Sequence, residues 1–526
     1  MDKFTYIGNA DAAVIENLYE QFLSDPDNLE PEWKQFFQGF EFARHHFPSS
    51  SSQDQEGNGK LRKEFNVIDL INAYRERGHL FTTTNPVRTR RKYYPSLDYQ
   101  NFGLEQTDMK ELFQAGNEIG LGRSSLEQIL GHLSQTYCQS IGAEFMYIRS
   151  PEIVEWLKSK MESTRNSPAF PLEKKHHILE KLIEAVGFEH FMRKRFPGQK
   201  RFSLEGCETL IPALDAMIEK GAGLGVQEYI IGMAHRGRLN VLANTLKKPY
   251  HKIFSEFEGK EYAEEALLGD VKYHLGCTLE TQTSNGLSVN LSIAPNPSHL
   301  EAVNPVAEGI ARAKIDKKFG GDVLKLLPVL IHGDASVAGQ GIVYEVLQMS
   351  QLPAYKTGGS IHLVINNQLG FTTNYLDGRS STYCTDVAKT IQSPIFHVNG
   401  DDVEAVVYTI ELAMEFRQKF RRDVFIDLLC YRKYGHNESD EPRFTQPLLY
   451  KIIETHPDPA EIYIKKLRQE EQLQEEKVAL IRESFDQKLE EELKRARAIE
   501  KGAIDPVLAK TWEAYHKAST EDMALP

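Results

Sequence analysis

The chain has 526 residues, enough for about two to four domains with a sizeable core. Hydrophobic residues make up 41% and charged residues 26% of the sequence, as in ordinary globular proteins, and no apolar stretch approaches the roughly 20 residues of a membrane-spanning helix. Acidic residues outnumber basic ones by 75 to 62, a net charge of -13, so neither a nucleic acid nor a membrane is an expected partner.

The N-terminus and the cysteines indicate where the protein works. Residues 1–20 have neither the apolar core of a signal peptide nor the Arg-rich, acid-poor composition of a transit peptide, so we expect a cytoplasmic protein. The cysteines are odd in number, lie far apart in the sequence and include no Cys-x-x-Cys, which indicates a reducing compartment and no zinc site. The five are Cys138, Cys207, Cys277, Cys384 and Cys430.

Residues 1–46 carry apolar positions at helical spacing, and residues 47–60 form a polar, Ser-rich run that is typical of a flexible linker. Two arrangements fit these residues about equally well. The N-terminal segment is either a tethered arm, suited to docking a partner, or a helix packed on the body with a loop after it.

A mainly helical region is predicted for residues 61–190, where apolar residues recur every three or four positions from Val67 to Tyr74. In residues 191–460 the pattern changes to continuous apolar runs, which suit parallel strands covered by helices on both faces. The runs are Tyr229–Met233, Leu326–Ile331, Ile361–Ile365 and Val424–Leu429. Helical segments at 341–352 and 402–420 alternate with them, which predicts an α/β fold with a doubly wound, mostly parallel sheet.

Residues 461–526 are predicted to form a charged helical connector. Between 461 and 500 the sequence is highly charged, and apolar side chains recur in a narrow stripe that includes Leu473, Phe485 and Leu493. Such a stripe predicts an amphipathic helix that packs on a neighbouring element.

Asp334 and Asn367 are predicted to meet at one edge of the sheet. Asp334 follows the apolar run that ends at Ile331, and Asn367 follows the run that ends at Ile365, with a Gly-containing turn and a helix between them. In a right-handed strand–helix–strand unit both strands point the same way. The two side chains therefore emerge together at the carboxyl ends of the strands, where open α/β sheets bind ligands.

The oxygen atoms near these strand ends suit a magnesium ion. A carboxylate from Asp334, a side-chain oxygen from Asn367 and the backbone carbonyl of Leu369 fit octahedral Mg²⁺ completed by diphosphate oxygens and water. The small residues Ala335 and Ser336 let a backbone come close to phosphate oxygens. Taken alone the pattern is weak, because an ordinary strand-end turn with a loop amide is the simpler explanation.

The stretch from 329 to 371 resembles the Gly-Asp-(Gly/Ala)…Asn-Asn signature of thiamine-diphosphate enzymes, with Ala335 at the third position as in the 2-oxoglutarate dehydrogenase branch. Further segments are similar to the same branch, and the resemblance covers nearly all 526 residues, beginning in the helical arm at Asn9–Phe37. These segments are Arg201–Gly206, Gly232–Asn240, Asp270–Gly276, Asn296–Glu301 and Gly435–Pro442. Together they favour the metal site over the ordinary turn.

This resemblance implies a thiamine-diphosphate-binding fold and a decarboxylating dehydrogenase whose cofactors are thiamine diphosphate and Mg²⁺. The implied reaction is the oxidative decarboxylation of 2-oxoglutarate in the tricarboxylic acid cycle, with transfer of the succinyl group to a lipoyl group. The implied partners are the dihydrolipoyl succinyltransferase component of a multienzyme complex and a second copy of the chain, since active sites in the family form between subunits.

The family's motifs also assign roles to individual residues. His235 and His274 are implied to be catalytic, through substrate binding or proton transfer, and imidazole suits both tasks. The implied substrate contacts are Arg236, His274 and Ser298. The implied cofactor set is Arg236, Ser298, Leu300, Asp334, Ala335, Ser336 and Asn367, and the implied metal ligands are Asp334, Asn367 and Leu369. Without the resemblance the histidines would be ordinary structural residues, Arg236 a surface ion pair and Ser298 part of a turn.

Members of this family are longer than the 526 residues of this chain. They continue with a pyrimidine-binding domain, which carries the glutamate that activates the aminopyrimidine ring of the cofactor. We therefore expect this chain to bind one end of the cofactor and to act only with a second half. A catalytically silent module that keeps metal–diphosphate or partner binding is the alternative. A nicotinamide-binding fold is rejected, because Gly221–Gly225 precedes a predicted strand instead of following one.

Overall fold

The computed structural model describes residues 12–46, 52–89, 92–259, 274–500 and 514. The chain separates into two compact units, Met1–Asn66 and Val67–Pro526. Within the described ranges, no helix combines the length and the apolar character that crossing a bilayer requires.

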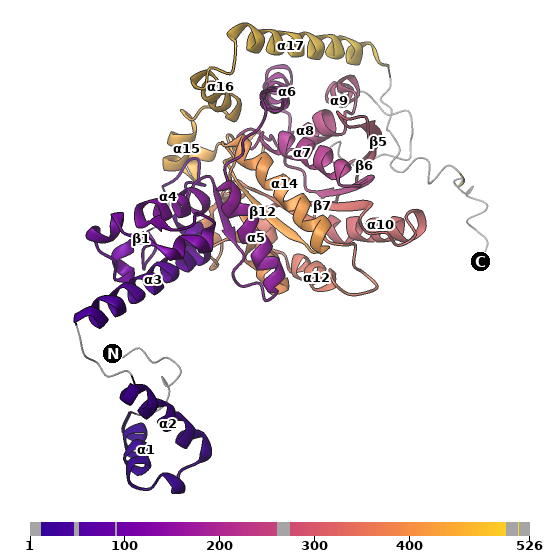
Figure 1. Ribbon diagram of the computed structural model, residues 1–526. Coiled ribbons are helices and arrows are strands. Elements are labelled where there is room, and N and C mark those ends of the chain that lie inside the picture. The colour runs from indigo at the N-terminus through magenta and orange to yellow at the C-terminus, as the bar shows by residue number, and fades with distance from the viewer. Residues whose placement is uncertain (1–11, 47–51, 90–91, 260–273, 501–513, 515–526) are drawn as a thin grey trace, which may run out of the picture. The chain divides into compact units, whose positions relative to one another are not determined.

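The first unit contains a helical hairpin with an aromatic core (Figure 1). Its helices are α1 (Ala12–Ser24) and α2 (Pro31–His46), joined through the short helix η1 (Pro26–Asn28). Phe37 of α2 is 3% exposed, and its ring centre lies 5.6 Å from that of Phe22 and 5.2 Å from that of Tyr19, both on α1.

The predicted linker is partly helical. Helix α3 (Ser52–Arg77) begins inside it, so residues 52–60 are helical, while residues 47–51 lie outside the described part of the chain. The reason is that a polar composition marks exposure to water and does not exclude a helix, for which Gln, Glu and Lys have good propensity.

The second unit opens with a mainly helical region, as predicted. Its helices after α3 are α4 (Leu126–Tyr137), α5 (Pro151–Thr164), α6 (Leu172–Arg195), η2 (Gly78–Phe81), η3 (Tyr99–Phe102), η4 (Gln106–Lys110) and η5 (Gln114–Ile119), with the two-residue strands β1 (Leu112–Phe113) and β2 (Ser124–Ser125). Helix α4 starts at Leu126 because Ser125 and Gln128 form a reciprocal capping box there. One longer strand, β3 (Ile141–Glu144), also lies in this region and was not predicted from the sequence.

An eight-stranded sheet in the order β3-β11-β12-β8-β7-β4-β6-β5 forms the centre of the second unit (Figure 1). Its other strands are β4 (Glu228–Met233), β5 (Cys277–Gln282), β6 (Ser288–Ile293), β7 (Leu326–Gly333), β8 (Ile361–Asn366), β11 (Ile395–Asn399) and β12 (Val424–Leu429). Neighbouring strands are parallel except at the two edges, where β3 and β5 run antiparallel to β11 and β6. The predicted apolar runs are β4, β7, β8 and β12, so the mostly parallel sheet is confirmed.

Helices cover both faces of this sheet, which makes it doubly wound as predicted. The main covering helices are α7 (Leu210–Gly223) and α14 (Val403–Phe420) on one face and α10 (Val303–Lys318) and α12 (Gly341–Met349) on the other. Alternate residues of β4 show the two faces. Tyr229 belongs to the main core and donates a hydrogen bond from its hydroxyl to the Ile218 carbonyl of α7 at 2.9 Å. Ile230 instead packs in a second cluster with Ala307 and Ala311 of α10.

The charged segment at 461–500, predicted as one helix, contains most of α16 (Pro459–Gln469) and the separate helix α17 (Glu475–Ala498). Helix α17 packs on α6 and on α9 (Tyr250–Phe257). Phe485 of α17 is 7% exposed, and its ring centre lies 6.0 Å from that of Tyr250. The ring covers Gly187 of α6, where an added Cβ would approach it to 2.9 Å.

The remaining elements are α8 (Arg238–Asn240), η6 (Val241–Thr245), α11 (Asp334–Gly339), β9 (Leu369–Gly370), β10 (Thr373–Asn374), α13 (Tyr375–Gly378), η8 (Cys384–Ile391), η9 (Pro442–Phe444) and α15 (Pro447–Ile453).

Candidate functional site

Asp334 and Asn367 lie at the same edge of the sheet, as predicted. Asp334 is the first residue of α11, directly after β7, and Asn367 directly follows β8. The two strands are parallel neighbours with Gly333 paired to Ile365. Both side chains are buried, and both line one cavity of about 100 Å³ at the carboxyl ends of the strands.

Eight of the ten residues assigned to the site by resemblance line this cavity. They are His235, Arg236, Leu300, Asp334, Ala335, Ser336, Asn367 and Leu369. Ser298 and His274 do not line it. Ser298 is exposed in the turn after β6, and His274 is buried, with its carbonyl accepting a hydrogen bond from the Asn296 amide at 3.1 Å. Residues 270–273 of the segment Asp270–Gly276 lie outside the described residues.

The oxygen atoms of the cavity fit a divalent cation. Asp334 is a buried carboxylate whose ion-pair partner, Arg379, is 3.7 Å away. Burial raises the pKa of Asp334 to about 6, against the lowering effect of Arg379, so the carboxylate lacks close compensation for its charge. The Asn367 side-chain oxygen accepts a weak hydrogen bond of 3.3 Å from the Leu369 amide, which leaves it lone-pair capacity. Carboxylate, amide and carbonyl oxygens are the donor set that Mg²⁺ prefers.

The turn that carries Asn367 and Leu369 has an unusual backbone. Gln368 and Phe371 have φ values of +68° and +57°, in the left-handed region that favours glycine. Gly370 lies so close to α11 that an added Cβ would come within 2.8 Å of the Ala335 side chain. The strained turn therefore holds its oxygen atoms directly against the start of α11, a pattern found where ligands are bound.

Basic side chains converge on the opposite wall of the cavity. Arg236 donates hydrogen bonds to the carbonyls of Ser203 at 3.0 Å and His436 at 2.7 Å, and burial together with Arg432 lowers its pKa to about 10, so it stays charged. Burial, then Arg236, lowers the pKa of His235 to about 3 and that of His436 to about 4. Cationic guanidinium groups can bind an anion, and the neutral imidazoles beside them can donate or accept a hydrogen bond.

The sequence reasoning did not single out Arg432 or Arg379. Arg432 also lines the cavity and donates a hydrogen bond to the Phe371 carbonyl at 2.9 Å. It follows β12 at the carboxyl edge of the sheet, a position that could have identified it. Arg379 comes from a loop after α13 with no such signal, and its Nε is buried without a hydrogen-bond partner.

The loop Gly435–Pro442 is anchored beside the site through a half-buried carboxylate. Glu438 accepts hydrogen bonds from the Arg201 amide at 2.8 Å and the Ser203 amide at 3.1 Å. Arg201 in turn pairs with Glu205 at 2.8 Å. These contacts hold the loop, and with it the cavity residue His436, against the segment around Ser203. The Ser203 carbonyl also accepts the hydrogen bond from Arg236.

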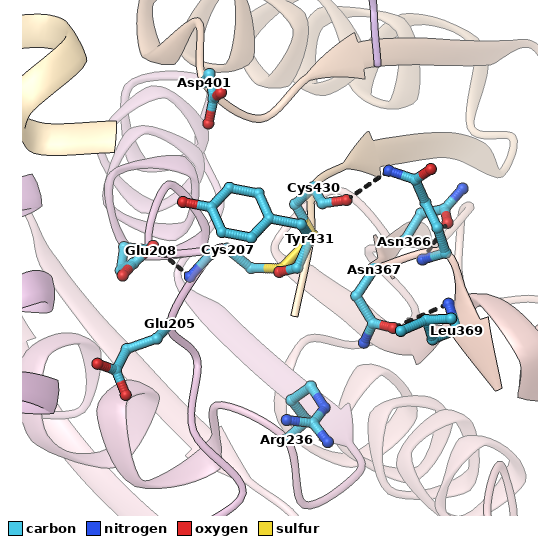
Figure 2. Close-up of a disulfide and its surroundings, with 12 residues drawn as sticks. Glu205, Cys207, Glu208, Arg236, Asn366, Asn367, Leu369, Asp401, Cys430 and Tyr431 are labelled. Atoms are coloured by element: carbon cyan, nitrogen blue, oxygen red, sulfur yellow. Dashed lines mark hydrogen bonds between the residues drawn. A yellow bond between two sulfur atoms is a disulfide. The ribbon is translucent and has the colours of Figure 1, made fainter. Parts of the chain in front are cut away.

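A disulfide joins Cys207 and Cys430, which corrects the interpretation of the cysteines (Figure 2). The two residues are 223 positions apart in the sequence, but their Cα atoms are 5.4 Å apart because the end of β12 lies against the segment before α7. The prediction that all the cysteines are reduced was therefore wrong for these two, because residues far apart in the sequence can be neighbours in the fold. The Cys430 amide donates to the Asn366 carbonyl at 2.9 Å, so the bridge adjoins the strand end that carries Asn367. The other described cysteines lie outside the disulfide and are buried: Cys138, Cys277 and Cys384.

Comparisons with known proteins agree with this geometry. The family model of the dehydrogenase E1 component matches residues 180–504, and a model of the 2-oxoglutarate dehydrogenase N-terminus matches residues 5–44. The 2-oxoglutarate dehydrogenase E1 component of Azotobacter vinelandii is 41% identical, over 98% of this chain and 58% of its own length. The same component of Cupriavidus necator is 44% identical, over 88% of this chain and 51% of its own length.

A longer relative is also similar. The multifunctional 2-oxoglutarate metabolism enzyme of Mycolicibacterium vanbaalenii is 47% identical, over 84% of this chain and 36% of its own length. The chain thus spans about half the length, 51% to 58%, of the 2-oxoglutarate dehydrogenase E1 components that it matches here.

Proposed function

We propose that this chain, which belongs to the dehydrogenase E1 component family, binds thiamine diphosphate with Mg²⁺ and serves the oxidative decarboxylation of 2-oxoglutarate. The observation that supports this most directly is the cavity shared by Asp334 and Asn367 at the carboxyl ends of β7 and β8. When bound, thiamine diphosphate supplies the electron sink that decarboxylation needs. The chain's own residues then have to hold the diphosphate, bind the substrate and exclude water.

The metal and the diphosphate occupy the carboxyl edge of the sheet in this proposal. Asp334, Asn367 and Leu369 supply oxygen ligands to Mg²⁺. The main chain at Ala335 and Ser336 approaches the diphosphate, together with the backbone at Leu300. All of these residues line the same cavity.

The basic wall binds the acidic groups in this proposal. Arg236 contacts the diphosphate or a substrate carboxylate through charge-assisted hydrogen bonds. His235 is neutral at physiological pH because burial and Arg236 lower its pKa to about 3, so it acts as a hydrogen-bond partner of the substrate. Its other implied role, proton transfer, rests on the family resemblance. His274 and Ser298 complete the substrate contacts, a role supported by the family resemblance and not by the cavity lining.

The acyl acceptor and the assembly belong to the same proposal. The succinyl group passes to a lipoyl group of a dihydrolipoyl succinyltransferase, and the chain pairs with a second copy of itself. The match of residues 5–44 to a family-specific N-terminal model supports a separate docking role for the arm at 1–46. We place the protein in the cytoplasm, and the Cys207–Cys430 disulfide is the observation that counts against that compartment.

A catalytically silent binding module is the second candidate. It would use the same cavity for metal and diphosphate and would differ from the enzyme in having no turnover. The two candidates differ in one measurement. Decarboxylation of 2-oxoglutarate with an artificial electron acceptor, after the remaining half of a relative is added, supports the enzyme, whereas cofactor binding with no turnover under any such condition supports the silent module.

The decisive test of cofactor binding uses Asp334→Ala. We expect the affinity for thiamine diphosphate in the presence of Mg²⁺ to fall by about 100-fold or more, since removal of an outer-shell partner alone weakens metal sites by about 10- to 100-fold. Isothermal titration calorimetry measures the affinity. Asp316→Ala, which removes an exposed carboxylate paired with Arg312 on α10, is the matched control and should bind like the wild type. Unchanged affinity in Asp334→Ala would remove the metal assignment.

A further inference from the structure

Glu301 adjoins the cavity where three elements of the site meet. It follows Leu300, a lining residue, and comes just before α10, with 5% of its surface exposed. Its carboxylate accepts hydrogen bonds from three side chains. These are the Ser336 hydroxyl of α11, His332 Nδ1 of β7 at 2.6 Å and the Asn304 amide of α10 at 2.7 Å.

The backbone of Glu301 is held in a conformation that a non-glycine residue adopts only at a cost. Its φ is +68°, in the left-handed region. Such positions persist where the surrounding contacts offset the strain, and they cluster at binding sites. Here the three hydrogen bonds to the carboxylate provide that stabilisation. They account for a glutamate at a position where the backbone conformation alone would favour glycine.

The contacts of Glu301 fix the groups on either side of it. His332 is held at both ring nitrogens, by Glu301 and by His362 Nδ1 at 3.0 Å. Ser336 directs its hydroxyl to Glu301, with the Gly333 carbonyl at 3.1 Å as a second acceptor. Its main chain, and not its hydroxyl, is therefore left to face the cavity. Burial alone would raise the pKa of Glu301, but His332 and the hydrogen bonds lower it overall, so both oxygens remain acceptors.

We propose that Glu301 is a positioning residue for the cofactor site. Its carboxylate locks the first turn of α11, and with it the Asp334 carboxylate two residues before Ser336, against the loop that carries Leu300. The inference rests on the proposed function, because what Glu301 tunes is the affinity for thiamine diphosphate and Mg²⁺. Glu301 does not itself line the cavity, and it acts on the cofactor through the lining residues Ser336 and His332 and through the loop.

A double-mutant cycle tests this role. Glu301→Gln and Ser336→Ala should each weaken binding of thiamine diphosphate at saturating Mg²⁺ by about tenfold or more, measured by calorimetry. The affinity of the double variant should be no more than about twofold below that of the single variant with the lower affinity. The reason is that the effects of substitutions at two residues that act as one unit do not add. Asn304→Ala is the control. It removes a contact to the same carboxylate from the α10 side, so it should lower the melting temperature and leave the affinity within about twofold.

The outcomes separate this inference from the proposed function. A wild-type chain that does not bind thiamine diphosphate contradicts the proposed function before any variant is compared. If the wild type binds, unchanged affinity in folded Glu301→Gln, or fully additive losses, overturns the positioning role. If Glu301→Gln does not fold, Glu301→Asp replaces it in the same cycle. That variant keeps a carboxylate for His332 but is one methylene too short to hold Ser336 as well.

Discussion

The buried carboxylate of Glu144 is neutralised by basic side chains that surround it. His397 bridges two carboxylates, with Nε2 at 2.9 Å from Glu144 and Nδ1 at 2.8 Å from Asp427. Lys389 adds an ion pair to Glu144 at 2.7 Å. Glu144, His397 and His79 lie close enough together to hold a metal ion, but Lys389 and His397 already pair with the Glu144 carboxylate.

Acid should weaken the fold through Glu144. Burial alone would raise its pKa, but the hydrogen bond and charge of His397 lower it from 4.5 to about 2. Since the pKa in the folded state is below that in the unfolded state, the stabilisation is complete above about pH 4.5 and is lost as pH falls towards 2. The melting temperature of the wild type should therefore approach that of Glu144→Gln over this range. Parallel pH profiles for the two proteins would contradict the assignment.

Single residues of the site differ in how well the sequence predicts them. Asp334 and Asn367 could be predicted because each ends a continuous apolar run, and parallel strands bring such ends together. Arg379 could not, because its position depends on a loop whose path has no periodic signal. The roles of all ten residues remain predictions, and the cavity lining adds no support for those of His274 and Ser298.

At the level of elements, the sequence predicts what is repetitive and long. The apolar runs predict four central strands because both faces of a parallel strand are buried. Strand β3 has only four residues, Ile141–Glu144, and lies next to helices in the sequence, so its pairing with β11 is a tertiary contact that local pattern does not encode. The helical state of residues 52–60 was not predicted for a different reason. Their polar composition was interpreted as a flexible linker, although polar residues also form exposed helices.

The stripe on α17 permits a stability prediction with an internal control. Phe485→Ala should lower the free energy of unfolding by about 3 kcal/mol, because it empties the space over Gly187 and beside Tyr250. Leu480→Ala, on the same helix but 67% exposed, should change it by less than about 0.5 kcal/mol. Urea unfolding measures both. Equal effects for the two variants would mean that α17 does not pack through its predicted face.

At the scale of the whole molecule, the Cys207–Cys430 disulfide links two distant parts of the chain. It closes a loop of 223 residues, and bridging a long loop stabilises a protein mainly by restricting its unfolded state. Reduction, or Cys207→Ser, should therefore lower the unfolding free energy by about 2–5 kcal/mol. Thermal melts with and without a dithiol reductant measure the effect. The Cys207→Ser protein serves as the control, because reductant should leave its melting temperature unchanged, and a reductant-insensitive wild type would argue that the bridge does not form.

The edge strand β3 has a practical consequence for anyone who wants to shorten this protein. The predicted boundary at residue 190 suggests a shorter chain that begins at residue 191. Strand β3, however, lies before this boundary and pairs with β11 after it. A chain trimmed to residues 191–460 would leave the main-chain amides and carbonyls along Ile395–Val398 open to other molecules. Exposed strand edges of this kind recruit further copies, so such a piece should aggregate, and both regions must be expressed together.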